Sequence, residues 1–142
     1  MWGVFLTGRM RKIEHIGIAV KDLAAANDNY SKLFNAKPYK LERVESEGVS
    51  TSFFMIGDSK IELLEATNDE SAIAKYIEKR GEGIHHIAYD VEDIASERQR
   101  LIDEGFQPIG EIKQGADNKL VCFFHPKSAN GVLVELCQER SE

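Results

Sequence analysis

Two histidines and two glutamates recur in this chain at matching positions, and together they could hold a divalent metal ion. His15 and His86 lie 71 positions apart, and Glu62 and Glu135 lie 73 positions apart. Imidazole nitrogens and carboxylate oxygens suit borderline divalent ions such as zinc, cobalt, nickel, manganese or iron(II). A single strand histidine is usually structural, but chance does not readily repeat both residue types at equivalent positions. The pattern therefore predicts one shared metal site.

The segments around the two histidines also repeat. Residues 13–24 read IEHIGIAVKDLA and residues 84–95 read IHHIAYDVEDIA, so each is a strand-like run that ends at an aspartate opening a helix. Gly17 and Ala88 share a strand face with the histidines, because side chains two positions apart point the same way. Small residues there leave room for a substrate. His85 points away from His86, which predicts either a structural role or a contact with a ligand residue.

The alternation of apolar and polar residues predicts the order β-α-β-β-β in each half of the chain. In the first half we expect strands near 13–20, 39–46, 49–56 and 60–66 and a helix between the caps Asp22 and Asn35; in the second half, strands near 84–91, 106–112, 119–124 and 131–138 and a helix from Asp93 to about Glu104. A connecting helix is predicted over 68–80. These elements predict an α+β fold made of two paired modules.

The repeat also sets the expected domain organisation. Residues 1–10 are predicted to be an N-terminal extension, and residues 11–140 a single domain. Within that domain, the first module covers 12–66, the linker helix 67–82 and the second module 83–138.

The composition excludes several classes of protein. The 142 residues carry a net charge of −6, which argues against a nucleic-acid-binding surface. No apolar run is long enough to span a membrane. Two cysteines, Cys122 and Cys137, are typical of free thiols in a reducing compartment, so a cytoplasmic protein is predicted.

The most distinctive segments of the chain are KIEHIGIAV at 12–20, NDESAIAKY at 68–76, GIHHI at 83–87, FHPKS at 124–128 and GVLVEL at 131–136. These segments resemble the vicinal-oxygen-chelate superfamily, and within it the family of methylmalonyl-CoA epimerases. The similarity extends from Lys12 to Gln138. It implies the glyoxalase fold, in which paired β-α-β-β-β modules form a curved mixed sheet around a metal cleft.

The resemblance implies that His15, Glu62, His86 and Glu135 bind one divalent metal ion per chain. Cobalt is the functional metal that it suggests, with zinc, nickel or manganese as alternatives. The implied reaction interconverts (2R)- and (2S)-methylmalonyl-CoA by a 1,1-proton transfer through a metal-stabilised enolate. Glu135 would be one catalytic base. The expected partners are an acyl-CoA substrate and a second copy of the chain in a homodimer.

The sequence offers several candidates for the second base that inversion needs. Some members of the family carry a glutamate three residues after the glycine that opens the third strand, but here Gly48 is followed by Thr51 at that position. Glu45, Glu47 or a water held by the metal are the candidates. The loop residues Lys119, Lys127 and Ser128 are candidate contacts for the phosphates of coenzyme A.

Two other functions fit the same architecture. A glyoxalase I-type lactoylglutathione lyase would use a similar ligand set and a similar proton transfer. A non-catalytic small-molecule-binding protein of this fold would often lack the metal ligands, and the presence of all four argues against it. The epimerase is the favoured interpretation, because the linker-helix and HPK-loop segments match it most specifically.

Overall fold

The computed structural model describes residues 10–140 of the chain. The elements are, in order, β1 (Met10–Ala19), α1 (Leu23–Phe34), β2 (Lys40–Val44), η2 (Glu45–Glu47), β3 (Val49–Ile56), β4 (Ser59–Ala66), α2 (Ala72–Arg80), β5 (Gly83–Val91), α3 (Ile94–Asp103), β6 (Pro108–Gln114), η3 (Ala116–Asn118), β7 (Lys119–Phe124), η4 (Pro126–Ala129) and β8 (Leu133–Glu139). The predicted β-α-β-β-β order is confirmed in both halves, as is the α+β class.

The chain forms two compact units. The middle unit is His15–His85, and the terminal unit, as described, consists of residues 10–14 and 86–140. The boundaries fall inside β1 and inside β5. Met10 already belongs to β1, whereas the rest of the predicted N-terminal extension, residues 1–9, lies outside the described residues.

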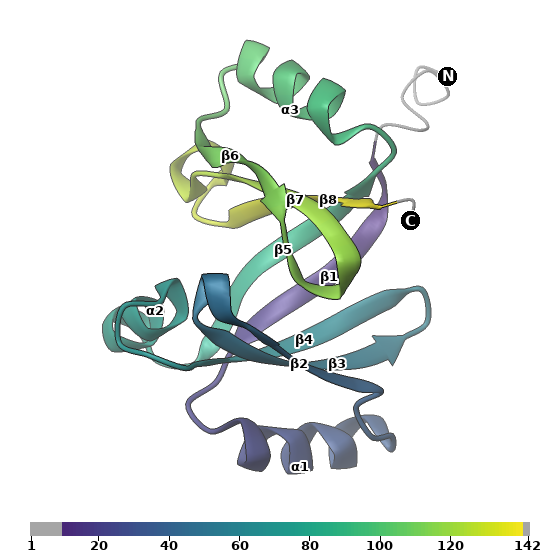
Figure 1. The fold of residues 1–142 in the computed structure, drawn as a ribbon, viewed down its shortest axis with the longest axis vertical. Helices are drawn as coiled ribbons and strands as arrows, with labels where there is room; N and C mark the ends of the chain where they lie inside the picture. Colours follow the sequence, from purple (N-terminus) through teal and green to yellow (C-terminus); the bar gives the residue numbers. More distant parts are fainter. Residues whose placement is uncertain (1–9, 141–142) are drawn as a thin grey trace. The chain divides into compact units, whose positions relative to one another are not determined.

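The middle unit contains a mixed sheet with the strand order β2-β3-β4-β1. β1 runs parallel to β4, and the other neighbours are antiparallel. Helix α1 covers one face of this sheet (Figure 1), where Val20, Phe54 and Leu63 are buried against Tyr30 and Phe34. Full burial of each large apolar side chain contributes about 1.5–3 kcal/mol, so this face holds α1 in place.

The opposite face of the middle sheet is covered at one end by α2. Ala19, Val49, Leu64 and Ile73 are buried together there. Ser71 begins α2 by accepting a hydrogen bond from the backbone N–H of Ala74. The rest of this face carries polar side chains and belongs to the candidate site.

Gly48 fixes the turn that leads into β3. Its φ of +66° lies in the left-handed region, and a Cβ there would come within 2.9 Å of Asn68 and Ser71. A larger residue would therefore displace both the turn and the start of α2. The position of β3 depends on this close approach.

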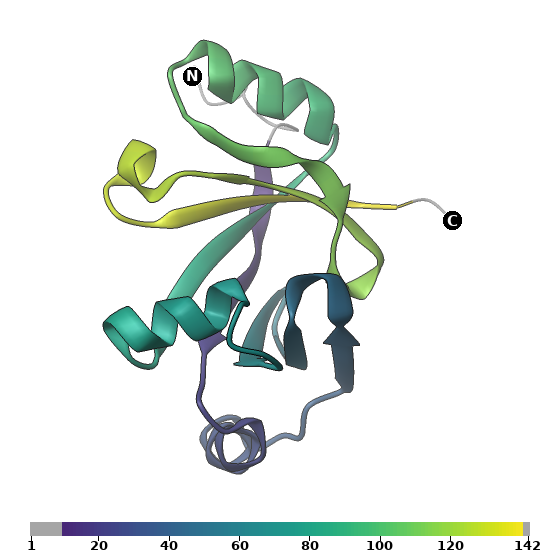
Figure 2. The same ribbon diagram turned by 60° about the vertical axis from the view of Figure 1, so that its left-hand side comes forward.

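The terminal unit repeats the arrangement with the strand order β1-β5-β8-β7-β6, in which only the first half of β1 takes part. Helix α3 lies over its sheet (Figure 2), and the core between them contains Val91, Leu101, Cys122, Phe124 and Leu136. Strand β1 starts earlier than predicted because its first residues pair with this unit. The Nε atom of Arg11 donates to Asp90 Oδ2 over 2.8 Å.

The helix ends follow the local signals in the sequence. Asp22 caps α1 by accepting from the N–H of Ala25, and Asp93 caps α3 by accepting from Ser96. Asn35 ends α1 in the left-handed conformation. All three predicted caps are confirmed.

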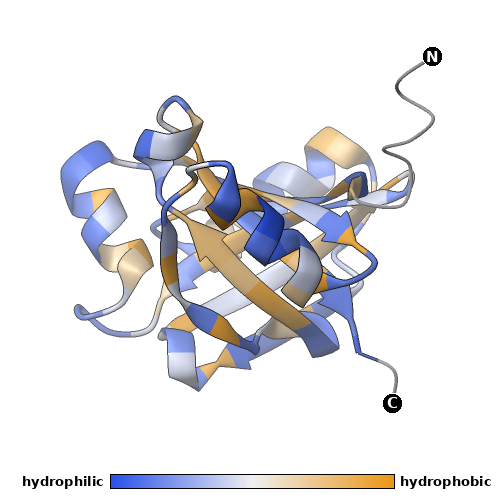
Figure 3. Ribbon diagram, turned by 90° about the horizontal axis from the view of Figure 1, so that it is seen from above, coloured by the Kyte–Doolittle hydropathy of each residue, from blue (hydrophilic) through white to orange (hydrophobic). Residues whose placement is uncertain are grey.

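The hydropathy of the chain follows these layers. Figure 3 shows the hydrophobic colour mainly in the strands, whereas the helices carry hydrophilic residues along much of their length. Such one-sided helices pack on a sheet with one face and meet solvent with the other. Within residues 10–140, no helix is both long enough and apolar enough to cross a membrane.

Candidate functional site

In the middle unit, the predicted ligands His15 and Glu62 lie side by side. Glu62 is on β4 directly opposite Gly17 of the parallel strand β1, so it shares a face with His15. The Nδ1 atom of His15 is 3.2 Å from Glu62 Oε2, and both side chains are 6% exposed. The sheet therefore brings one imidazole and one carboxylate together in a buried place.

The terminal unit contains the equivalent pair. Glu135 on β8 lies opposite Ala88 of the parallel strand β5, on the face of His86. The Nε2 atom of His86 is 3.1 Å from Glu135 Oε1, and both side chains are 7% exposed. Each predicted histidine thus has its predicted glutamate as a neighbour. The small residues that sequence parity placed beside the histidines, Gly17 and Ala88, lie next to the glutamates.

Each pair is accompanied by an aromatic ring and a lysine. Phe53 lies opposite Glu62 and Phe123 opposite Glu135 in the antiparallel pairings. The Nζ atom of Lys40 lies 5.4 Å from the ring centroid of Phe53, and that of Lys113 lies 5.6 Å from Phe123. The repeat therefore includes the groups that border the pairs.

The donor set of each pair fits a divalent metal ion. A nitrogen and an oxygen that bind one ion at ~2.1 Å lie roughly 3 Å apart, close to the separations observed in both pairs. A buried carboxylate beside an imidazole also needs a positive charge, from a proton or from a cation. His15, Glu62, His86 and Glu135 are the residues that could supply such ligands.

The other two histidines pack against an aromatic ring and cap a short helix, respectively. The ring of His85 packs edge-on against Tyr76 of α2 with centroids 4.9 Å apart, whereas His86 packs against Phe123. The predicted opposite orientation of these neighbours is confirmed. His125 caps η4, since its Nδ1 accepts a hydrogen bond from the N–H of Lys127.

The two cysteines differ in their surroundings. Cys137 is fully buried on the face of Glu135, and its Sγ donates to Glu135 Oε2 over 3.2 Å. Cys122 is equally buried but belongs to the core beneath α3. Burial raises the pKa of the Cys122 thiol to about 11. The Glu135 carboxylate is therefore contacted by His86 through one oxygen and by Cys137 through the other.

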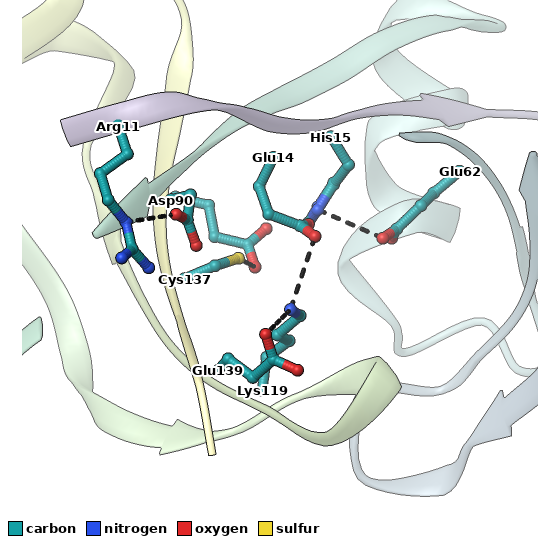
Figure 4. Close-up of polar contacts among 9 residues, drawn as sticks. Arg11, Glu14, His15, Glu62, Asp90, Lys119, Cys137 and Glu139 are labelled. Carbon is teal, nitrogen blue, oxygen red and sulfur yellow. Dashed lines mark hydrogen bonds and ion pairs between the residues drawn. The ribbon is translucent and has the colours of Figure 1, made fainter. Parts of the chain in front are cut away.

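Charged residues fill the neighbouring part of the terminal sheet. The Nζ atom of Lys119 lies 3.7 Å from Glu14 Oε2 and 3.8 Å from Glu139 Oε1 (Figure 4). Glu14 is 3% and Lys119 9% exposed. Lys119 thus lies close to two protein carboxylates, and its contact with a phosphate stays a prediction. Of the other two loop residues, Ser128 accepts a hydrogen bond from the N–H of Gln107.

Three residues bear on the position of the second base, namely Thr51, Glu45 and Glu42. Thr51 is 1% exposed and lies on the His15–Glu62 face, as its pairing opposite Leu64 requires. Glu45 is exposed at the end of β2 and forms an ion pair with Arg43. Glu42 lies directly opposite Thr51 and faces the same side. Glu42 is not among the candidates considered from the sequence, because its position opposite Thr51 depends on the register between β2 and β3.

Solved structures of methylmalonyl-CoA epimerases are similar to this chain in sequence and in fold. A solved epimerase structure, methylmalonyl-CoA epimerase from Mycobacterium tuberculosis, is 30% identical, with a TM-score of 0.89 over 95% of this chain and 92% of that one. A methylmalonyl-CoA epimerase in complex with methylmalonyl-CoA and NH4+ is 33% identical, with a TM-score of 0.89 over 93% of this chain and 96% of that one.

The sequence has curated relatives of matching length. The ethylmalonyl-CoA/methylmalonyl-CoA epimerase of Cereibacter sphaeroides is 42% identical over 130 residues, which cover 89% of this chain and 97% of that protein. The sequence model of the glyoxalase/bleomycin resistance protein/dioxygenase superfamily matches residues 14–123. With this match and the repeated β-α-β-β-β units, the chain belongs to the glyoxalase/bleomycin resistance protein/dioxygenase superfamily.

Proposed function

We propose that this protein is a metal-dependent epimerase that interconverts (2R)- and (2S)-methylmalonyl-CoA. The observation that carries the proposal is the likeness to epimerases along most of the chain, at 42% identity to a relative of almost the same length. The two buried His–Glu pairs support it, since they are ligand sets of the kind that such chemistry needs. A structural neighbour in complex with methylmalonyl-CoA supports an acyl-CoA substrate.

We further propose that both pairs serve one metal ion, with His15, Glu62, His86 and Glu135 as its ligands. The support is the repetition of type, burial and separation in the two units, because a duplicated half-site is what a shared site requires. A divalent ion would supply Lewis acidity that stabilises negative charge on the substrate oxygens. Nitrogen and oxygen donors are compatible with cobalt, zinc, nickel or manganese.

The side chains of this chain would carry out the proton transfer. The α-hydrogen of methylmalonyl-CoA lies between a thioester and a carboxylate, which makes it weakly acidic. Glu135 is the proposed base, with its carboxylate oriented by His86 and Cys137. The small residues Gly17 and Ala88 leave space beside the glutamates, and the rings of Phe53 and Phe123 limit access of water.

A metal and activity assay tests the proposal. We expect one divalent ion per chain in purified protein and inversion of methylmalonyl-CoA. His86→Ala should remove most of the metal, whereas His85→Ala should retain it, because His85 packs on Tyr76 rather than on Glu135. Equal loss of metal in the two variants would exclude the assigned ligand set. Turnover of a glutathione hemithioacetal without turnover of methylmalonyl-CoA would support the lyase instead.

We also propose that the protein forms a homodimer. Strands β2 and β6 end the strand orders of their units, and Leu41 on β2 is 64% exposed. Open sheet edges with apolar side chains are commonly covered by another chain. Light scattering at micromolar concentration should give about twice the 16.0 kDa mass of one chain. A 16.0 kDa species throughout that range would reject the dimer.

A further inference from the structure

We propose that Glu42 on β2 is the second acid/base group of the epimerase. It would replace the carboxylate expected at position 51, where this chain has a threonine. This inference rests on the proposed function. Inversion requires a proton to leave one side of the substrate carbon and to arrive on the other, so two groups are needed. A threonine hydroxyl is too weak a base for this step at neutral pH.

Strand pairing puts Glu42 beside Thr51 on the functional face. Glu42 is the direct cross-strand partner of Thr51, which in turn is the partner of Leu64. Directly opposed residues have Cβ atoms ~5 Å apart and project to the same side. Glu62 lies two positions from Leu64 on β4, and so shares that side. Because Thr51 is short, the longer glutamate of the neighbouring strand can extend over it.

A lysine directs the Glu42 carboxylate along the face. The Oε1 atom of Glu42 is 3.4 Å from Lys40 Nζ, and the same ammonium lies 5.4 Å from the centre of the Phe53 ring. Phe53 is the cross-strand partner of Glu62. The Glu42 carboxylate therefore leans along β2 toward Lys40, in the direction of the row that contains Phe53 and the proposed ligand Glu62, and away from Val44 at the end of the strand.

The exposure of Glu42 suits a group that exchanges protons with a bound substrate. Its side chain is 32% exposed, between the buried ligands and the side chain of Glu45, which is 75% exposed. Glu45 lies in η2, beyond the end of β2, and its ion pair with Arg43 ties it to a residue on the opposite face of the strand. Glu42 is thus better placed than Glu45 for the missing function.

The hydroxyl of Thr51 provides an independent indication of a ligand on this face. Among the described residues, four buried side-chain polar atoms have no hydrogen-bond partner, and Thr51 Oγ1 is the one on the His15–Glu62 face. Leaving a buried hydroxyl without a hydrogen-bond partner is energetically unfavourable. A substrate oxygen that accepts from Thr51 would recover this energy. That contact would hold the substrate next to the cross-strand partner, Glu42.

The proton transfer balances with two carboxyl groups. The Glu42 carboxylate takes the α-hydrogen as a proton, and the electron pair of the broken C–H bond moves into the enolate. Protonated Glu135 then donates its proton to the opposite side of the carbon. Glu42 ends protonated and Glu135 ends ionised, and exchange with water restores both groups. The reverse direction uses the same groups with their roles exchanged.

The test follows the α-hydrogen of each epimer separately in deuterated solvent. In Glu42→Gln, inversion should fall by ~10²-fold or more. One epimer should keep exchanging its α-hydrogen through Glu135 with retention of configuration. The exchange rate of the other epimer should fall as much as the rate of inversion does. Metal content should stay at the wild-type level. The matched control Glu45→Gln should behave as wild type, and adding Thr51→Glu to Glu42→Gln should restore inversion.

The outcomes separate this inference from the proposed function. A wild-type protein without epimerase activity overturns the proposed function itself. An active wild type with unchanged inversion in Glu42→Gln overturns only the role of Glu42. Equal loss of exchange from both epimers would also overturn it. Partial unfolding cannot imitate the expected result, because the ratio of exchange between the epimers does not depend on the amount of active protein.

Discussion

The middle and terminal units have the same framework, but they complete their His–Glu faces with different chemistry. In the middle unit, Ala19 and Val49 lie beyond the pair, and α2 covers them with Ile73. At the equivalent positions the terminal unit has Asp90 and Lys119, which form ion pairs. In the middle unit, this end of the face is therefore covered by an apolar contact with α2, whereas in the terminal unit it carries ion pairs.

The difference teaches which parts of the repeat the fold requires. Both units keep an apolar face under a helix, with Phe54 beneath α1 and Phe124 beneath α3. This face sets the packing of each unit, so its residue types stay alike. The other face keeps the pair, its ring, a lysine over that ring and a small residue beside the glutamate, whereas other positions differ. Beside Glu135 lies the thiol of Cys137, whereas beside Glu62 lies Leu64, which offers no donor.

The largest expected effect would break the equivalence of the two carboxylates. Glu135→Gln should reduce turnover by ~10²–10⁴-fold, because an amide keeps a carbonyl oxygen for a metal but cannot act as a base. Glu62→Gln should reduce turnover much less, since Glu62 is proposed as a ligand only. Rates of inversion and metal content would be measured for both variants. Wild-type inversion in Glu135→Gln with metal retained would eliminate Glu135 as a base.

Lys119 in the terminal unit and Val49 in the middle unit occupy equivalent positions but should stabilise their units by different interactions. Lys119→Met should lower the free energy of unfolding by about 3 kcal/mol, because Glu14 stays buried without the lysine ammonium. Val49→Ala at the equivalent place in the middle unit should cost about 2 kcal/mol through lost apolar contact. Urea denaturation gives both values. The variant Glu14→Gln with Lys119→Met should recover part of the loss; no recovery would mean that charge burial is not the cause.

The buried thiol of Cys122 should make the free energy of unfolding decrease at alkaline pH. An unfolded thiol titrates near ~8.5–9, whereas the pKa of Cys122 in the folded protein is about 11. Its contribution to stability is therefore complete below pH ~8.5 and is lost as the pH rises toward 11. Between pH 8 and 10 the wild type should lose about 1–2 kcal/mol more than Cys122→Val. Parallel stability curves for the two proteins, measured by urea denaturation, would argue against this origin.

The smallest effect should be equal in the two units. Asp22→Ala and Asp93→Ala should each lower the free energy of unfolding by about 1 kcal/mol, since each aspartate accepts one hydrogen bond at a helix start. Thermal unfolding monitored by circular dichroism would measure both. Asp28→Ala, in the middle of α1, is the matched control and should be close to neutral. A large difference between the two cap variants would show that the helices contribute unequally.

The sequence predicted those parts of the molecule that local patterns determine. Caps such as Asp22 and Asp93 and the opposite orientations of His85 and His86 follow from neighbouring residues alone. The internal repeat added the pairing of each histidine with its glutamate. These contacts could be predicted because the same module occurs twice.

Other contacts could not be predicted, because they depend on the register between strands. The placement of Glu42 opposite Thr51 follows from how β2 pairs with β3, which the residue pattern alone does not fix. The contacts of Lys119 with Glu14 and of Arg11 with Asp90 join segments that are far apart in the chain. The repeat gave no guidance there, because the two units differ at these positions.

The division of β1 between the units has a consequence for the protein during its synthesis. The middle unit is one uninterrupted stretch, so a ribosome releases all of its strands before those of β6, β7 and β8 are made. The terminal unit instead needs Met10–Glu14, which is synthesised before the middle unit, to pack against residues that are synthesised after it. Until Asp90 emerges, Arg11 lacks the acceptor that it has in the finished protein. We therefore expect the nascent chain to order its middle first and to join its two ends last.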